Sequence, residues 1–290
     1  MDILLTGGTG QVGISLQQLG WPDGIRLHAP ARSELDLGDP ASVQRAVDAR
    51  PWSAIISSGA YTAVDKAESE VGQAWAANAL APAILAHGAA RAGIPIVHVS
   101  TDYVFAGTKD GFYREDDPVG PVGIYGASKE GGEQAVRTAN PRHAIVRTAW
   151  VVSPHRANFL RTMLRLAADR DELRVVADQF GCPTFAGDLA NALQNMVLRL
   201  ARDETAPTGT YHFVNAGEAS WADFAAAIFE ASARRGGPSC RVVPITTADY
   251  PTPARRPANS RLATDRIRAD FGIEPRPWQA ALDEAVAVLV

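Results

Sequence analysis

The stretch "DILLTGGTGQVG", residues 2–13, joins an apolar run to a glycine-rich turn and the start of a helical pattern. Gly7, Gly10 and Gly13 recur at three-residue intervals between the predicted strand and the predicted helix. Such a turn lets backbone amides at a helix N-terminus approach a pyrophosphate, which the helix dipole also favours. Close packing of a strand on a helix fits the same glycines. The stretch therefore predicts an α/β fold with a candidate dinucleotide site.

Strands and helices continue to alternate after this turn, which is typical of crossover units in a parallel sheet. We predict a Rossmann-type, doubly wound parallel sheet in an NAD(P)-binding domain over residues 1–150. Residues 151–290 are predicted to form mainly a smaller, mixed α/β substrate-binding domain, with some segments returning to the first domain. In the first domain the predicted strands lie in 2–6, 24–30, 54–60, 94–100 and 143–150, and the predicted helices in 11–20, 40–50 and 71–92.

The pattern after Trp150 is less regular. Ser220 is a candidate N-cap for the helix that follows it. The stretch "YPTPARRPANSRL", residues 250–262, is rich in proline and arginine, which argues against regular structure and favours a surface or lid-like connection. Helices are predicted in 157–170, 187–202 and 220–235, and a strand in 209–215.

Composition excludes several classes of protein. The formal net charge is -4, with acidic and basic residues interspersed, so polymeric nucleic acid is not an expected partner. No run of about twenty apolar residues is present, so we expect no membrane association and a cytoplasmic location. Cys182 and Cys240 lack metal-type spacing, and both are expected to be reduced.

The second strand ends in "HAPARSELDL", residues 28–37, without the carboxylate that an NAD-specific site usually places there. Arg32 is positioned in sequence to meet a 2′-phosphate, with Ser33 as a second donor. Glu34 is close enough to pair with Arg32 or to repel the phosphate. We therefore predict that NADPH is preferred and NADH accepted, although a solvated loop arginine fits the same residues.

Two further motifs carry candidate chemistry. "YGASK" places Tyr125 and Lys129 one helical turn apart, where a nearby ammonium would lower the pKa of the phenol for proton transfer to a carbonyl. "STDYVF" ends a predicted strand with Ser100 and Thr101, either of which offers a hydroxyl beside Tyr125. An exposed tyrosine over an exposed lysine is the plainer explanation of the first motif taken alone.

Together these residues resemble the dTDP-4-dehydrorhamnose reductase family of extended short-chain dehydrogenases/reductases. The resemblance runs from Gly7 through the "RRPANSRL" loop. The segments that carry it are "GGTGQVG", "GAYTAVDKAES", "STDYVF", "YGASKEGGE", "RTAWVV", "NFL" and "DQFGCPT". It implies reduction of the 4-keto group of a dTDP-linked keto sugar, dTDP-4-dehydro-β-L-rhamnose, in dTDP-rhamnose biosynthesis.

The resemblance also implies roles for individual residues. Thr101, Tyr125 and Lys129 would be the catalytic set, with Tyr125 as proton donor. Cofactor-binding residues would be Gly7, Thr9, Gly10, Gln11, Val12, Gly13, Arg32, Asp36, Leu37, Ala60, Tyr61, Thr62, Tyr125 and Lys129. Substrate-binding residues would be Thr62, Val64, Thr101, Asp102, Tyr103, Tyr125, Trp150, Asn158 and Arg256.

Plainer explanations exist for some of these assignments. Tyr103 and Trp150 also fit a hydrophobic core, Asn158 also fits a helix cap, and Arg255 and Arg256 also fit a solvated loop.

The chain departs from the pattern of those family members that bind magnesium at a dimer interface. Ser15 and Gly187 occupy positions that are acidic in those members, and Asp188 is adjacent but shifted. We predict no metal, and a monomer or a homodimer. Reduction or epimerisation of another nucleotide-linked keto sugar remains an alternative. A second alternative is a non-catalytic, cofactor-binding regulatory subunit such as the β subunit of methionine adenosyltransferase.

Overall fold

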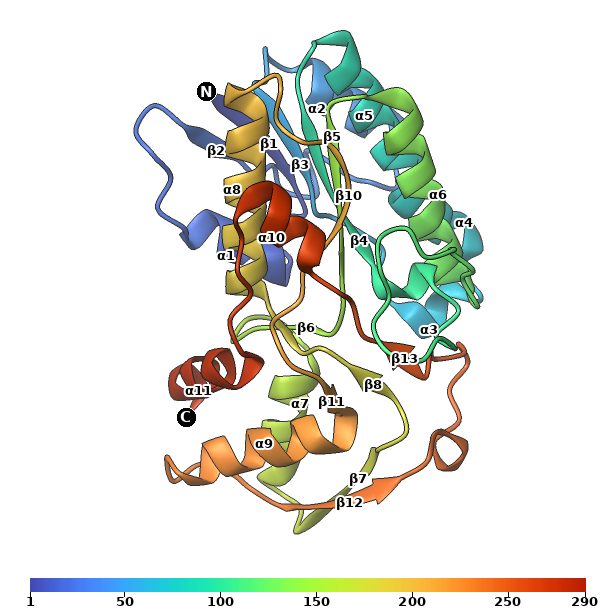
Figure 1. The fold of residues 1–290 in the computed structure, drawn as a ribbon, viewed down its shortest axis with the longest axis vertical. Helices are drawn as coiled ribbons and strands as arrows, with labels where there is room; N and C mark the ends of the chain where they lie inside the picture. The colour runs from blue at the N-terminus through green and yellow to red at the C-terminus, as the bar shows by residue number, and fades with distance from the viewer.

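The computed structural model describes all residues, 1–290, and is built around one six-stranded parallel sheet (Figure 1). The strand order reverses between β1 and β3, the kind of switch point at which open α/β sheets bind ligands. The predicted α/β fold with a parallel central sheet is confirmed. From one edge to the other the strands are β10 (Gly209–His212), β5 (His143–Thr148), β4 (Ile96–Thr101), β3 (Ala54–Ser57), β1 (Asp2–Thr6) and β2 (Arg26–His28).

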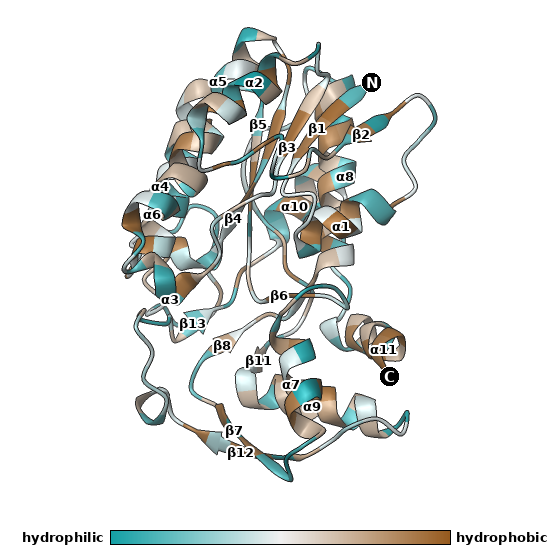
Figure 2. Ribbon diagram, turned by 180° about the vertical axis from the view of Figure 1, so that it is seen from behind, coloured by the Kyte–Doolittle hydropathy of each residue, from teal (hydrophilic) through white to brown (hydrophobic).

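Helices cover both faces of this sheet because its strands are apolar on both sides (Figure 2). In β1, Ile3 and Leu5 face one helix layer while Leu4 faces the other. The layer on the Ile3 side consists of α1 (Gln11–Gln18), α8 (Ala186–Arg202) and α10 (Asp265–Phe271). The opposite layer contains α2 (Pro40–Asp48), α5 (Ala81–Arg91) and α6 (Ile124–Ala139).

The predicted helix over 71–92 is not one regular helix. It consists of α4 (Val71–Trp75), a π-helical segment η1 (Ala76–Leu80) and α5, which follow one another directly. A π-helical segment widens the backbone locally and is frequent at functional sites. Here it contains the fully buried Asn78. The short helix α3 (Val64–Ala67) precedes this region.

A smaller lobe lies beyond the carboxyl ends of the strands (Figure 1). Its separate core includes Leu160, Leu173, Phe224 and Leu282. Ser220 caps α9 through a capping box with Asp223, as the sequence predicts. The helices of this lobe are α7 (Phe159–Ala167), α9 (Trp221–Ala233) and α11 (Trp278–Leu289). The short strands β6 (Val151–Val152), β7 (Glu172–Val176), β8 (Phe180–Gly181), β9 (Thr184–Phe185), β11 (Ala219–Ser220) and β12 (Arg241–Ile245) complete it.

The stretch 250–262 is more ordered than its proline content predicts. It follows the 3-10 turn η3 (Thr247–Asp249) and contains the two-residue strand β13 (Asn259–Ser260), which pairs with β8. The expectation that this stretch lacks regular structure is therefore wrong for its second half. Leu262 also forms an isolated bridge with Tyr113. Backbone pairing with the lobe overrides the local proline signal here.

Candidate functional site

The glycine turn forms a cradle with no room for side chains. Gly7 has φ +74°, and a Cβ on it would lie 2.5 Å from the Cα of Gly59. A Cβ on Gly13 would lie 2.2 Å from the carbonyl oxygen of Gly7. Gly10 is the N-cap residue of α1, and no side chain caps that helix. The exposed helix amides and the close backbone approach fit a dinucleotide pyrophosphate.

Other predicted cofactor residues surround this turn. Leu37 lies against Gly59, the residue after β3 that packs on Gly7, because a Cβ on Gly59 would meet Cδ1 of Leu37 at 2.7 Å. Ala60, Tyr61 and Thr62 follow β3 at the carboxyl edge of the sheet. The Gln11 side chain is instead held by the protein, since it donates to the carbonyl of Val151 at 3.2 Å.

Arg32 extends into solvent, with 85% of its side chain exposed. Its Nε lies 3.4 Å from Oδ2 of Asp36. Glu34 forms no ion pair with Arg32, and its Oε2 accepts a hydrogen bond from the backbone N–H of Ala31 at 2.9 Å. The Arg32 guanidinium is therefore held only by an exposed ion pair with Asp36.

The three predicted catalytic residues meet where β4 ends against α6. Thr101 is the last residue of β4, and Tyr125 and Lys129 lie one turn apart on α6. Lys129 is buried, and its Nζ donates a hydrogen bond of 2.7 Å to the carbonyl of Val99. The Thr101 hydroxyl donates to Oδ1 of Asp102 at 3.0 Å.

The electrostatics of this group differ in one respect from the sequence argument. Burial raises the pKa of Tyr125, whereas the sequence argument expects the Lys129 ammonium to lower it. That expectation is wrong for this structure because desolvation outweighs the other influences. A raised pKa keeps the phenol protonated, which is the form of a proton donor. Burial also lowers the pKa of Lys129 to about 8 and raises that of Asp102 to about 6.

Most of the predicted substrate residues lie around this centre. Tyr103 packs edge-on against Tyr125, with ring centroids 5.4 Å apart, and Nη1 of Arg256 donates to its hydroxyl at 3.2 Å. Thr62 and Val64 lie in the loop before α3 and at the start of that helix. Trp150 stacks on the indole of Trp221 in the smaller lobe.

Asn158 is mainly a structural residue in this arrangement. Its Oδ1 caps α7 by accepting from the N–H of Arg161 at 3.1 Å. Its Nδ2 donates to Oε1 of Gln11 at 2.8 Å, beside the glycine turn. Thr9 of that turn accepts a hydrogen bond at its carbonyl from Arg156, which has φ 60°. These bonds fix the crossing from the sheet to the smaller lobe against α1.

Two polar residues that sequence reasoning missed hold the candidate site together. The Asn78 side chain accepts from the N–H of Tyr61 at 2.8 Å and donates to Oγ of Ser128 at 3.0 Å. It thereby links the segment after β3 to α6. Glu68 accepts from the N–H of Ile124 at 2.9 Å, at the start of the helix that carries Tyr125. Asn78 has a sequence signal, because it is a polar residue inside the apolar run "AANALAPAILA". Glu68 lies in "GAYTAVDKAES", but nothing in that segment indicates that it bonds to the start of α6.

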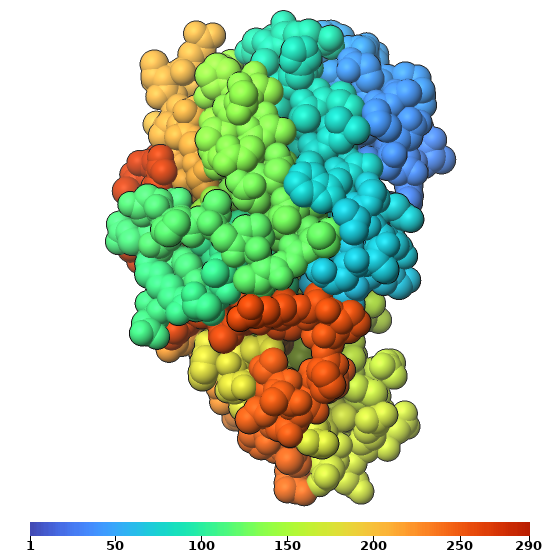
Figure 3. Space-filling model, turned by 90° about the vertical axis from the view of Figure 1, so that its right-hand side faces the viewer, coloured from blue at the N-terminus to red at the C-terminus, as the bar shows by residue number.

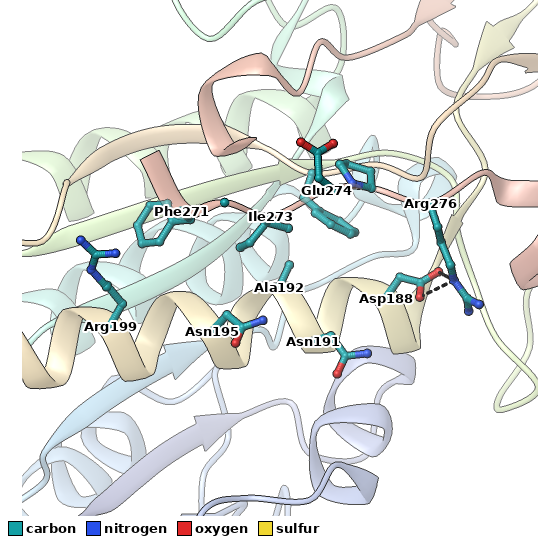
Figure 4. A pocket seen from close by; sticks show the side chains of 12 residues that line it. Asp188, Asn191, Ala192, Asn195, Arg199, Phe271, Ile273, Glu274 and Arg276 are labelled. Atoms are coloured by element: carbon teal, nitrogen blue, oxygen red, sulfur yellow. Dashed lines mark hydrogen bonds and ion pairs between the residues drawn. The ribbon is translucent and has the colours of Figure 1, made fainter. Parts of the chain in front are cut away.

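A surface cavity of about 560 Å³ lies away from these residues, between α8 and the segment after α10 (Figure 4). Asn191, Asn195 and Arg199 of α8 line it. Asp188, at its rim, is paired with Arg276 at 2.9 Å. No predicted cofactor, substrate or catalytic residue lines this cavity. No cluster of three or more His, Cys, Asp or Glu side chains in the structure is arranged to hold a metal ion.

None of the helices has both the length and the apolar character needed to cross a membrane.

The RmlD substrate binding domain family model matches residues 1–290. A dTDP-4-dehydrorhamnose reductase of Sinorhizobium fredii is 44% identical over 292 residues, covering 100% of this chain and 98% of that protein. The protein of the same name from Escherichia coli K12 is 40% identical over 287 residues, covering 97% of this chain and 96% of that protein.

Solved structures agree with these sequence relationships. The dTDP-4-dehydrorhamnose reductase of Clostridium acetobutylicum superposes with a TM-score of 0.93 at 35% identity, covering 100% of this chain and 99% of that chain. The Bacillus anthracis enzyme, solved in complex with NADP, gives a TM-score of 0.89 at 34% identity and covers 99% of both chains. The resemblance expected from the sequence motifs is confirmed, and the chain belongs to the dTDP-4-dehydrorhamnose reductase family.

Proposed function

We propose that the protein reduces the 4-keto group of dTDP-4-dehydro-β-L-rhamnose to give dTDP-β-L-rhamnose, with NADPH as the reductant. The observation that carries this proposal is that Thr101, at the end of β4, meets α6 with Tyr125 and Lys129 at the same carboxyl edge of the sheet as the glycine turn, in a member of this family. The nicotinamide supplies a hydride when bound. Together with one proton, this hydride converts the C4 carbonyl into a secondary alcohol.

The proton comes from the phenol of Tyr125 in this mechanism. Its raised pKa keeps the hydroxyl protonated until the carbonyl oxygen gains negative charge. Thr101 offers a hydroxyl next to that oxygen and so favours the developing charge. Lys129 holds the cofactor ribose by a hydrogen bond and places positive charge near the phenolate that remains.

The remaining roles follow from position. The glycine turn and the N-terminus of α1 would hold the pyrophosphate, and residues 60–62, which follow β3, would lie beside the cofactor. Asp102, Tyr103, Trp150 and Arg256 form the substrate side of the site. The domain boundary at residue 150, the oligomeric state and the cytoplasmic location stay predictions.

A product assay tests the proposal. The protein is incubated with dTDP-4-dehydro-L-rhamnose and NADPH, and the nucleotide sugar formed is identified by NMR. We expect one NADPH oxidised per dTDP-L-rhamnose formed. Epimerisation without net NADPH consumption, or NADPH binding without turnover, would replace the proposed reduction by one of the two alternatives.

A further inference from the structure

The connection from η3 to β13, residues 250–258, crosses the junction between the sheet domain and the smaller lobe. We call these residues the strap. Figure 3 shows it as an orange-red band running between the two parts of the molecule. At its C-terminal end the carbonyl of Ala258 accepts a hydrogen bond of 2.9 Å from the N–H of Phe180. That end of the strap is therefore fixed to the smaller lobe.

A single carboxylate of the sheet domain holds the middle of the strap. Asp65 lies in the first turn of α3, directly after Val64. Its Oδ1 accepts from the backbone N–H of Ala254 at 3.2 Å, and its Oδ2 accepts from Nη2 of Arg256 at 2.6 Å. One side chain thus binds both the backbone and the guanidinium of the same segment.

Arg256 continues this chain of contacts to the proposed proton donor. Its Nη1 donates to the hydroxyl of Tyr103, whose ring packs edge-on against Tyr125. Only 21% of the Arg256 side chain is exposed, compared with 85% of the Arg32 side chain. A guanidinium has five N–H donors, and these two bonds use two of them. The other N–H groups of Arg256 donate to no acceptor of the protein.

We propose that Asp65 is a positioning residue that fixes the strap so that Arg256 presents its free N–H groups to the diphosphate of a nucleotide sugar. This inference rests on the proposed function and adds a residue to it. A preformed guanidinium needs less ordering when the ligand binds, so more of its interaction with phosphate oxygens appears as affinity. Without Asp65 the arginine keeps its bond to Tyr103 and the packing of Ala254 and Pro257, but it loses the ion pair that fixes its guanidinium.

A double-mutant cycle measures this coupling. The ligand is dTDP, and its Kd is measured by calorimetry with NADP present for the wild type, Asp65→Ala, Arg256→Ala and the double variant. We expect each single variant to weaken dTDP binding about tenfold or more, as for loss of a charge-assisted hydrogen bond. The double variant should bind dTDP about as well as Arg256→Ala, because both changes remove one interaction.

Three controls separate positioning from a general loss of structure. Asp65→Asn keeps an acceptor for Ala254 and should fall between the wild type and Asp65→Ala. Thymidine, which lacks phosphates, should bind equally to all variants. Asp116→Ala removes a carboxylate from an exposed ion pair with Arg114 and should change nothing. NADPH affinity should be the same in every variant.

Proteolysis gives a readout that does not depend on the ligand. Trypsin can cleave the strap at the Arg255–Arg256 bond, while the following proline protects the next bond. Asp65→Ala should be cut there several times faster than the wild type, with unchanged Tm. In steady-state kinetics KM for the keto sugar should rise while kcat stays close to the wild-type value.

Two results would overturn the inference. One is dTDP binding by Asp65→Ala that equals or exceeds that of the wild type, which would mean that Asp65 is neutral or competes with the diphosphate. The other is additive effects of Asp65→Ala and Arg256→Ala on the Kd. If the coupling is found but the keto sugar is not reduced, Asp65 still positions Arg256 for a nucleoside diphosphate, and only the proposed reaction is wrong.

Discussion

The indole of Trp150 lies flat on the indole of Trp221, with ring centroids 3.5 Å apart and 12° between the planes. The stack joins the end of the sheet domain to the first residue of α9 in the smaller lobe. Trp150 has φ 51°, a left-handed backbone conformation that is unfavourable for a bulky side chain and costs about 1–3 kcal/mol. A Cβ on Gly181 would lie 2.5 Å from Cε2 of Trp150, so the indole also fills the space that a side chain there would need. Packing on both sides therefore holds Trp150 in its strained conformation.

Trp221→Ala is expected to release Trp150 and lower kcat/KM for the keto sugar about tenfold, a scale typical of losing a packed aromatic anchor. NADPH affinity should not change, because neither indole is among the groups that pack on the glycines of the turn. Trp221→Phe keeps a stacking ring and should retain most activity. The exciton signal of the stacked indoles in circular dichroism should vanish in both variants. Unchanged kcat/KM in Trp221→Ala would remove the stack from the proposed site.

Local pattern was enough to predict the sheet, the glycine turn and the capped helix α9. Each of these depends on residues adjacent in sequence, such as Ser220 and Asp223. The tyrosine and lysine of the candidate site were also readable, since one helical turn fixes their spacing. What could not be read were partners distant in sequence: the Asp65–Arg256 pair spans 191 positions, and Asn78 bonds to Ser128 across 50. The pKa of Tyr125 was misjudged for the same reason, because burial is a tertiary property.

Tyr125→Phe should lose most turnover while keeping the fold and NADPH affinity, because the ring remains and only the acid is removed. General acid catalysis commonly contributes about a hundred- to ten-thousand-fold to a rate. Single-turnover oxidation of NADPH with the keto sugar measures the loss. Tyr103→Phe is the matched control: it removes a phenol that Arg256 contacts, and should affect KM more than kcat. Nearly native turnover in Tyr125→Phe would assign the proton to another group.

Lys129→Ala should weaken NADPH binding and slow the reaction, since the ammonium has two tasks in the proposed mechanism. Burial lowers its pKa from 10.5 to about 8, so the free protein loses this charge as the pH rises through about 8. We therefore expect the wild-type Kd for NADPH to increase above that pH and the Kd of Lys129→Ala to show no such step. Fluorescence titrations of NADPH between pH 6 and about 9.5 test both statements. A rise of equal size in the Kd of Lys129→Ala would show that the pH effect comes from a group other than Lys129.

Asp102→Asn should change the pH dependence of stability. Burial raises the pKa of Asp102 from 3.8 to about 6, so the folded state binds more protons than the unfolded chain between these values. The free energy of unfolding therefore falls as the pH rises through this window. Above it, the ionised Asp102 lowers the free energy of unfolding by at most about 3 kcal/mol. The asparagine variant should gain stability relative to the wild type at pH 8 but not at pH 3.5. Urea unfolding at both pH values measures the difference in free energy of unfolding between the variant and the wild type. The same difference at pH 3.5 and pH 8 would show that Asp102 ionisation is not involved.

Arg32 is expected to produce a preference for NADPH over NADH. β2 ends in His28 and not in an acid, so no carboxylate of the strand itself is placed to bind the ribose hydroxyls or to repel a 2′-phosphate. Glu34 accepts a hydrogen bond from the N–H of Ala31 and forms no ion pair with the Arg32 guanidinium. The remaining partner, Asp36, lies 3.4 Å away and half-exposed, so this ion pair is weak and can be exchanged for phosphate oxygens.

Arg32→Ala should lower the ratio of kcat/KM for NADPH to that for NADH roughly tenfold at one ionic strength. Arg45→Ala, which removes a similarly exposed arginine paired with Asp39, should leave the ratio unchanged. A wild-type enzyme that favours NADH, or a ratio that survives Arg32→Ala, would show that the 2′-phosphate is read by another residue.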